Sequence, residues 1–328
     1  MSKINNYLKQ NLKKRHAIII ILPILSLIFP VITTHEYVLF VITWANIFAI
    51  FAASWDLLAG VAGQFSFGHA LFFGVAGYVA AALNIYLGLP PWITIPASGA
   101  FGVLVGLIVG LPSLRLKGPY FTITSLTFPL ILQNIIYMFP QITKGSDGLT
   151  GLTALSTDYV VKYYLSAVLM ITSIFILLKI ANSRIGLIFR SIRDNEDTAE
   201  ATGINTVKYK LLAFAISGFF AGIAGSFQVH FVGSVGPSIL NPFYSIQAIL
   251  FAGIGGIGTI VGSVGGAYLM IISNEVLRDL VAIRVLISAV IMVLVFRFLP
   301  KGIIRTIAVY YRIPIGFWNG LKKLRRSK

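Results

Sequence analysis

Hydrogen-bonding side chains interrupt an otherwise apolar stretch near residue 60, where they could contact a polar solute. The stretch runs DLLAGVAGQFSFGH from Asp56 to His69 and offers Gln64, Ser66 and His69 as donors or acceptors. Backbone that leaves a helix inside a membrane must find partners in the protein or line a wet cavity. The stretch therefore predicts either a helix break beside a solute pathway or a tight turn at the membrane surface with a structural histidine.

A second stretch, GPYFTITSLTFPLILQN at residues 118–134, has the composition of a membrane span with many hydrogen-bonding groups. Serine and threonine often bond the backbone of their own helix, so a structural role is the default for any one of them. Six polar side chains on more than one face favour contact with a water-filled path, and Pro129 should bend the helix. The candidate pathway residues from both stretches are Gln64, Ser66, His69, Thr122, Thr124, Ser125 and Asn134.

A third stretch, GIGGIGTIVGSVGG at residues 253–266, is rich in glycine. Glycines at this spacing let helices approach closely, which is mainly a packing signal. Residues 60–80 and 253–273 also share a weak similarity in their glycine positions. Gly-interrupted segments in corresponding places of two halves suggest an inverted repeat around a central site.

The residue types give little support to catalytic or metal chemistry. The chain has no cysteine, and its four histidines are scattered at positions 16, 35, 69 and 230. No nucleophile pairs with a base, and no GxxxxGK[ST] phosphate-binding loop is present. We therefore expect no catalytic residue, no metal and no cofactor.

The elements that hold these residues should be membrane-spanning helices. Of the 328 residues, 57% are hydrophobic and 11% are charged, against about 25% charged in a typical soluble domain. The net charge of +16 resides mostly at the ends of apolar segments and in the two tails. This placement favours contact with lipid headgroups over nucleic acid. The fold class is therefore an all-α polytopic membrane protein.

About ten membrane segments are expected, because a helix needs roughly 20 apolar residues to cross the hydrocarbon layer. The segment at 243–256 is short, so eight crossings plus a re-entrant hairpin at 243–258 fit equally well. The predicted segments are 17–34, 37–58, 66–87, 92–111, 119–139, 159–180, 209–231, 243–256, 259–277 and 280–298. The domain boundaries are a basic tail at 1–16, a membrane domain at 17–299 with a polar loop at 182–208, and a basic tail at 300–328.

Charge asymmetry predicts the orientation. Loops on the cytoplasmic side of a membrane carry an excess of lysine and arginine. Both tails are strongly basic, so both termini should be cytoplasmic, and the loop at 182–208 then faces the cytoplasm as well. We expect a multi-pass protein of the cell membrane.

The polar run SRIGLIFRSIRDNEDTAEATGINTVKY at residues 183–209 holds four of the ten acidic residues. Its pattern predicts a short helix along the membrane face, with Asp194 or Asn195 able to cap a helix start and Gly203 at its end. The run is either a solvated loop between two spans or a docking surface for a partner outside the membrane.

These stretches resemble the permease subunit of branched-chain amino acid ABC transporters over most of residues 40–275. The similar segments are GQFSFGHALFFGVAGY, KGPYFTITSLTFPLILQNI, SRIGLIFRSIRDNEDTAEATGINTVKYKLLAFAISGFFAGIAGSF and GGIGTIVGSVGGA. The family includes relatives that carry urea and short amides, and more distant ones that carry sugars. The long cytoplasmic match is the specific one.

The resemblance implies a coupling helix near residues 190–203 that docks on an ATP-hydrolysing subunit. The coupling residues would be Arg190, Ile192, Arg193, Asp194, Asn195, Glu196, Glu200 and Gly203. The chain departs from the Glu-Ala-Ala…Gly motif of other importers, because Glu200-Ala201-Thr202-Gly203 is a compressed version. The partners implied are a second homologous permease, two ATP-binding subunits and an external solute-binding protein.

The activity implied is inward transport of branched-chain amino acids by alternating access. A urea or short-amide permease is the alternative within the family. A proton- or ion-driven transporter is an alternative from another class, but it would need ionisable residues inside the spans. The few candidates are Asp56, His69, His230 and Glu275.

Overall fold

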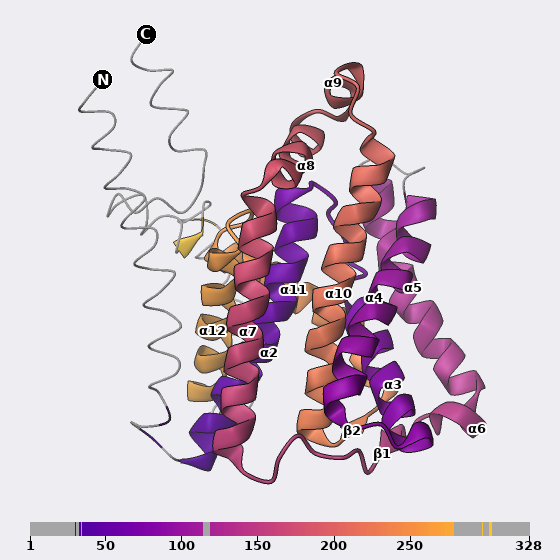
Figure 1. Cartoon of the computed structure of the whole chain (residues 1–328), viewed down its shortest axis with the longest axis vertical. Coiled ribbons are helices and arrows are strands. Elements are labelled where there is room, and N and C mark those ends of the chain that lie inside the picture. Colours follow the sequence, from indigo (N-terminus) through magenta and orange to yellow (C-terminus); the bar gives the residue numbers. More distant parts are fainter. Residues whose placement is uncertain are drawn as a thin grey trace.

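A computed structural model describes residues 35–113 and 119–278, together with residues 30, 33, 297, 302 and 303. Long helices lie side by side along one axis (Figure 1). They are α2 (Glu36–Asp56) with the π-helical turn η1 (Leu57–Val61), α3 (Ala70–Leu87), α4 (Pro91–Ser113), α5 (Pro119–Met138), α7 (Tyr159–Ala181) and α10 (Thr206–Val232). The shorter helices are α6 (Pro140–Thr143), α8 (Arg184–Asp194), α9 (Glu196–Ala201), η2 (Pro237–Leu240), α11 (Pro242–Gly255) and α12 (Val261–Val276).

Six helices in the described residues are long and apolar enough to cross a membrane. They correspond to the predicted spans at 37–58, 66–87, 92–111, 119–139, 159–180 and 209–231. The helix of the second span begins only at Ala70, so residues 66–69 of that prediction are not helical. The predicted spans 17–34 and 280–298 lie outside the described residues, apart from residues 30, 33 and 297.

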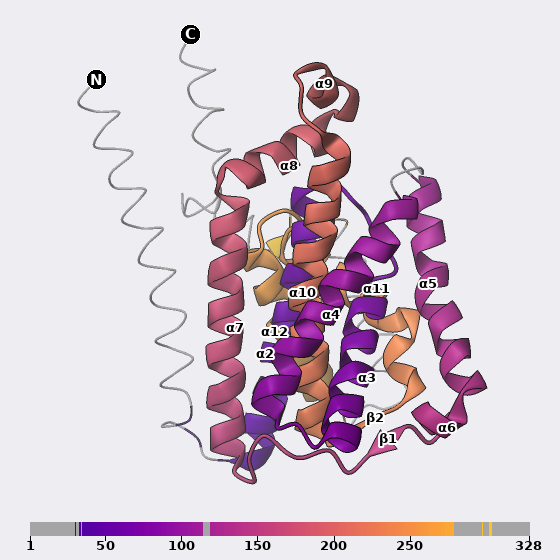
Figure 2. The same ribbon diagram turned by 45° about the vertical axis from the view of Figure 1, so that its right-hand side comes forward.

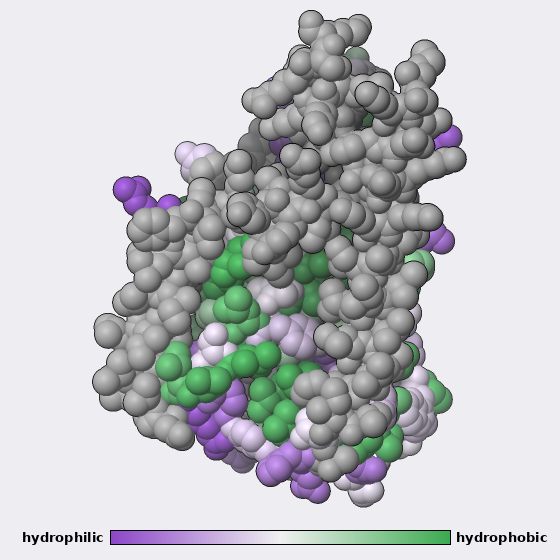
Figure 3. Space-filling model, turned by 90° about the vertical axis from the view of Figure 1, so that its left-hand side faces the viewer, coloured by the Kyte–Doolittle hydropathy of each residue, from purple (hydrophilic) through white to green (hydrophobic). Residues whose placement is uncertain are grey.

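The two ends of the helix bundle carry different elements. Helices α8 and α9 cover one end, whereas α6 and a two-stranded ribbon lie at the other (Figures 1 and 2). The ribbon pairs β1 (Leu149–Thr150) antiparallel with β2 (Ser234–Val235). Helix α2 begins and helix α12 ends at the ribbon's end of the bundle, where Arg278 Nη1 donates to Tyr37 Oη over 2.5 Å. Between the grey atoms of Figure 3, the surface is mostly hydrophobic, with hydrophilic residues gathered at its lower edge.

Two stretches between helices, the first break at residues 62–69 and the second break at residues 233–241, leave the regular α-helix. After α2 and η1, the chain is non-helical over residues 62–69 before α3 begins. After α10, residues 233–241 form β2 and η2 before α11 begins. Inside the protein the first residue of α3 bonds α11, because Ser245 Oγ accepts a hydrogen bond from the Ala70 amide over 2.8 Å. Helix α11, with 14 residues, is shorter than the six candidate spans.

Helices α2 and α10 have similar neighbours in the bundle. Helices α2 and α10 run in opposite directions (Figure 1). Helix α10 packs on α3 and α4, and α2 packs in the same way on α11 and α12. An inverted repeat that relates residues 60–80 to 253–273 stays a prediction.

Helices α4 and α10 contact each other through their backbones. Gly102 and Gly218 face one another, and a Cβ atom on either would overlap the carbonyl oxygen of the other. Gly106 contacts the carbonyl of Phe214 in the same way. In lipid, helices gain stability from such close van der Waals contact rather than from apolar burial alone. This contact fixes α4 against the helix that carries one of the two breaks.

We predict that Gly102→Val destabilises the protein by roughly 1–3 kcal/mol, because the side chain forces the two backbones apart. The apparent unfolding temperature of the purified protein in detergent should fall. Ala100→Val adds comparable bulk on the exposed face of the same helix and serves as the control. Equal unfolding temperatures for the two variants would contradict the close contact.

Candidate functional site

Helix α8 lies across the end of the bundle with one face buried. Ser183 caps its start by accepting from the Ile185 amide over 3.2 Å. Phe189 and Ile192 are buried, at 0% and 4% exposure. Arg190 is half-buried and donates from Nη2 to the Ala181 carbonyl at the end of α7 over 2.7 Å. Of the predicted coupling residues, Ile192 and Arg190 therefore anchor the helix rather than face outward.

The predicted single short helix is in fact two helices. Asn195 has extended backbone, with φ of −163°, and ends α8. Its side chain then caps α9 by accepting from the Thr198 amide over 2.8 Å, as the sequence predicted for this position. Gly203, at φ of +85°, ends α9, and the Ile204 amide closes the turn on the Ala199 carbonyl over 3.2 Å. The polar run is an angular cap made of two short helices (Figure 2).

Two contacts attach α9 to the start of α10. Lys210 Nζ pairs with Glu196 Oε1 at 2.5 Å, and the Lys210 side chain is only 6% exposed. Glu200 Oε1 accepts from the Thr206 hydroxyl over 2.5 Å. Helix α9 is thus held in place by α10 and still presents exposed residues outward. The exposed positions are Asp194, Asn195, Asp197, Thr198, Glu200, Ala201, Thr202 and Gly203.

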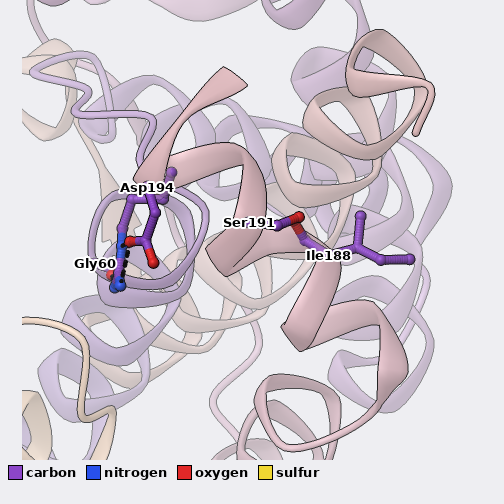
Figure 4. A network of polar contacts seen from close by, with 5 residues as sticks. Gly60, Ile188, Ser191 and Asp194 are labelled. Atoms are coloured by element: carbon purple, nitrogen blue, oxygen red, sulfur yellow. Dashed lines mark hydrogen bonds and ion pairs between the residues drawn. The ribbon is translucent and has the colours of Figure 1, made fainter. Parts of the chain in front are cut away.

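Arg193 points toward the membrane helices rather than only outward. Its Nη1 atom donates to the Gly60 carbonyl in η1 over 2.7 Å, while Nε and Nη2 bond Asp194 Oδ1 at 3.1 and 2.9 Å. Figure 4 shows Gly60 and Asp194 side by side at this contact. Carbon atoms of the Arg193 side chain lie close to Gly63, where a Cβ atom would be 2.6 Å from Cγ. The residue expected to dock a partner therefore also links α8 to the first helix break.

The first break is held together by buried hydrogen bonds. Ser66 is 2% exposed, and its carbonyl accepts from Trp55 Nε1 over 2.8 Å. His69 is fully buried, with Nε2 2.9 Å from Ser54 Oγ and its ring 4.9 Å from that of Phe51. Both residues therefore support the break structurally, and neither is exposed to a pathway in this conformation.

Helix α5 contributes the other side of this contact. Ser125 Oγ accepts from the Phe67 amide over 2.9 Å and donates to the Thr122 carbonyl over 2.7 Å. Thr122 Oγ1 donates to the Phe65 carbonyl over 3.0 Å. Thr122 and Ser125 therefore lie beside residues 65–67 of the first break. Their bonds satisfy the broken backbone.

The remaining candidate pathway residues are more accessible. Gln64 and Thr124 are half-buried. Asn134 is exposed and donates to the Leu130 carbonyl of its own helix over 2.8 Å, so it does not join the group around the break.

A buried carboxylate next to η1 was not among the predicted site residues. Asp56 is fully buried, and its two oxygens accept from the amides of Gly258 and Ile260 over 2.6 and 2.7 Å. Ile260 has φ of +57°, a strained conformation for a β-branched residue that costs about 1–3 kcal/mol. The signal in the sequence was an acidic residue at the end of an apolar span, which is rare unless it has a role.

The ionisable residues inside the bundle have bonded partners. His230 lies between Thr94 Oγ1, 2.7 Å from Nε2, and the Thr153 carbonyl, 3.0 Å from Nδ1. Glu275 pairs with Arg278 at 3.4 Å. Within residues 35–113 and 119–278, no group of three metal-ligating side chains comes together. The arrangement suits a structural scaffold more than a relay of protons or ions.

Comparison with known proteins finds similarity to permease proteins of transport systems. Two relatives are the high-affinity branched-chain amino acid transport system permease proteins LivM of Salmonella typhimurium and Escherichia coli. The first is 27% identical over 291 residues, covering 80% of this chain and 68% of the relative. The second is 26% identical over 320 residues, covering 89% and 75%. The ribose import permease protein RbsC of Haemophilus influenzae is 27% identical over 276 residues, covering 80% and 83%.

The family model described as "Branched-chain amino acid transport system / permease component" matches residues 37–297. This range includes both helix breaks, α5 and the α8–α9 cap. The chain belongs to the family of branched-chain amino acid transport permease components.

Proposed function

We propose that this protein is the membrane-spanning subunit of an ATP-driven importer of branched-chain amino acids. The observation that carries the proposal is the family match over residues 37–297 together with a rigid, outward-projecting cap at α8–α9. The subunit would work with a second homologous permease, two ATP-binding subunits and an external solute-binding protein. The chemistry of ATP hydrolysis would belong to the ATP-binding subunits.

The α8–α9 end of the bundle is the cytoplasmic end in this proposal. Basic residues near this end outnumber those near the ribbon, in keeping with the excess of positive charge on cytoplasmic loops. In the described residues, the α8–α9 end has Lys179, Arg184, Arg190, Arg193, Lys208 and Lys210, against Lys144, Lys162 and Arg278 at the other. Both termini would then be cytoplasmic.

The α8–α9 cap would serve as the docking surface for an ATP-binding subunit. Its buried anchors, Phe189 and Ile192, fix α8 to the bundle, and the Glu196–Lys210 pair fixes α9 to α10. Force applied to the exposed side of α9 would therefore move α7 and α10 rather than bend the cap. Nucleotide can drive transport only if the ATP-binding subunits bind the two conformations of the permease with different free energy.

The solute pathway would run beside α5 and the first break, on the side of these two segments that the rest of the protein does not cover. Gln64 and Thr124 are the half-buried polar residues there, and Asn134 lies on the exposed face of α5. Ser66, His69, Thr122 and Ser125 would act indirectly, by holding the break in the shape that the pathway needs. The second permease would cover the exposed face of α5.

A sugar is the second candidate for the solute. The ribose permease relative matches 80% of this chain at an identity similar to that of the LivM proteins. The higher coverage of the E. coli LivM protein, 89% of this chain, favours the amino acid.

We predict that Asp197→Lys with Glu200→Lys lowers uptake by about tenfold or more, because it reverses the charge of the exposed side of α9. A tenfold loss corresponds to about 1.4 kcal/mol of docking free energy. Co-purification of the ATP-binding subunits should weaken in parallel. Asp147→Lys reverses an exposed charge near the ribbon and should leave co-purification unchanged. Normal docking by the double variant would contradict the assignment.

We also predict that the complex, reconstituted in vesicles with its ATP-binding and solute-binding subunits, accumulates labelled leucine when ATP is supplied. Uptake should persist when the proton gradient is collapsed and stop when ATP is removed. Excess isoleucine or valine should compete, whereas ribose and urea should not. Competition by ribose alone would assign the protein to sugar transport, and uptake driven by the proton gradient would contradict an ABC importer.

A further inference from the structure

The π-helical turn η1 is bonded on two sides by residues from distant parts of the chain. On one side, Arg193 of α8 donates to the Gly60 carbonyl over 2.7 Å. On the other side, the turn before α12 approaches so closely that a Cβ atom on Gly60 would be 2.5 Å from the Gly258 nitrogen. One helical turn thus contacts the start of α12 and the end of α8 together.

The contact with α12 depends on the Asp56 carboxylate. Both of its oxygens accept backbone amides of the turn, from Gly258 at 2.6 Å and Ile260 at 2.7 Å. A carboxylate is expensive to bury at membrane depth unless such bonds satisfy it. Removing one oxygen acceptor would leave a buried amide unpaired, so this contact cannot be exchanged for an apolar one without loss.

The contacts at η1 bring together two helices that are far apart along the chain, since α8 ends at Asp194 and α12 begins at Val261. Helix α8 is joined covalently to α7 and, through α9, to α10. Helix α12 packs on α2 and α11, whereas α10 packs on α3 and α4. The path from Arg193 through Gly60 and Asp56 to Gly258 links the cap to the group of α2, α11 and α12.

We infer that Asp56 is a positioning residue that transmits the movement of α8 to α12. This inference rests on the proposed function, in which α8 moves when the ATP-binding subunits close. When α8 moves, the bond from Arg193 to Gly60 moves η1 at the end of α2. The Asp56 carboxylate, one turn earlier, then moves the turn before α12 through its bonds to Gly258 and Ile260. The group of α2, α11 and α12 then moves together with the group of α10, α3 and α4, as alternating access requires.

The first test measures the ratio of leucine transported to ATP hydrolysed in reconstituted complexes. Asp56→Asn should lower this ratio about tenfold while ATP hydrolysis and co-purification of the ATP-binding subunits stay near normal, and Arg193→Met should lower the ratio by a similar factor. The double variant should be no worse than either single variant, because both changes break the same path. Arg193→Lys retains a donor and should restore part of the ratio. Glu275→Gln changes a carboxylate at the far end of α12 and is the matched control.

A second measurement does not depend on the folding of the Asp56 variant. The chain has no cysteine, so Ile257→Cys introduces a single labelling site in the exposed part of the α12 turn. Its rate of maleimide labelling should differ between the nucleotide-free complex and the complex trapped with a non-hydrolysable ATP analogue. Adding Arg193→Met, which changes a partly exposed side chain, should remove this difference.

The outcomes separate the inference from the proposed function. A normal transport ratio in Asp56→Asn, or additive losses in the double variant, would overturn the inference while leaving the importer assignment intact. So would nucleotide-dependent labelling of Cys at position 257 that survives Arg193→Met. A wild-type complex without ATP-driven uptake would overturn the proposed function and the inference with it.

Discussion

A backbone amide or carbonyl inside a membrane has no water to bond, and this constraint shapes the whole structure. The chain leaves the helix over residues 62–69, so the protein must supply partners for the backbone groups freed there. Ser125 bonds the Phe67 amide, Trp55 bonds the Ser66 carbonyl and Ser245 bonds the Ala70 amide. These polar residues of the spans therefore bond the free backbone groups at the first break and at the start of α3.

This use of polar residues explains which parts of the site could be predicted. Their number in residues 118–134 indicated a special span, and Thr122 and Ser125 do meet the first break. Sequence reasoning could not tell a residue that bonds backbone from one that contacts solute, because the same hydroxyl can do both. Asn134 was assigned to the group on composition alone, and its side chain bonds its own helix.

Local signals located the helices and caps well and failed on long-range contacts. Asn195 and Gly203 have conformational preferences that act within a few residues, so their roles in the α8–α9 cap were predictable. The direction of the Arg193 side chain and the bonds of Asp56 depend on segments more than 130 and 200 residues away in the chain.

The ion pair between Glu196 and Lys210 has a consequence for the behaviour of the cap in solution. Dissolved ions weaken interactions between exposed charges over a Debye length of about 8 Å at 0.15 M salt, but they act far less on a pair that solvent hardly reaches. The Lys210 side chain is 6% exposed and the Glu196 side chain 28%, so salt screens this pair less than it screens fully exposed charges. The position of α9 against the start of α10 should consequently change little between dilute buffer and concentrated salt, even where the charges around them are fully screened.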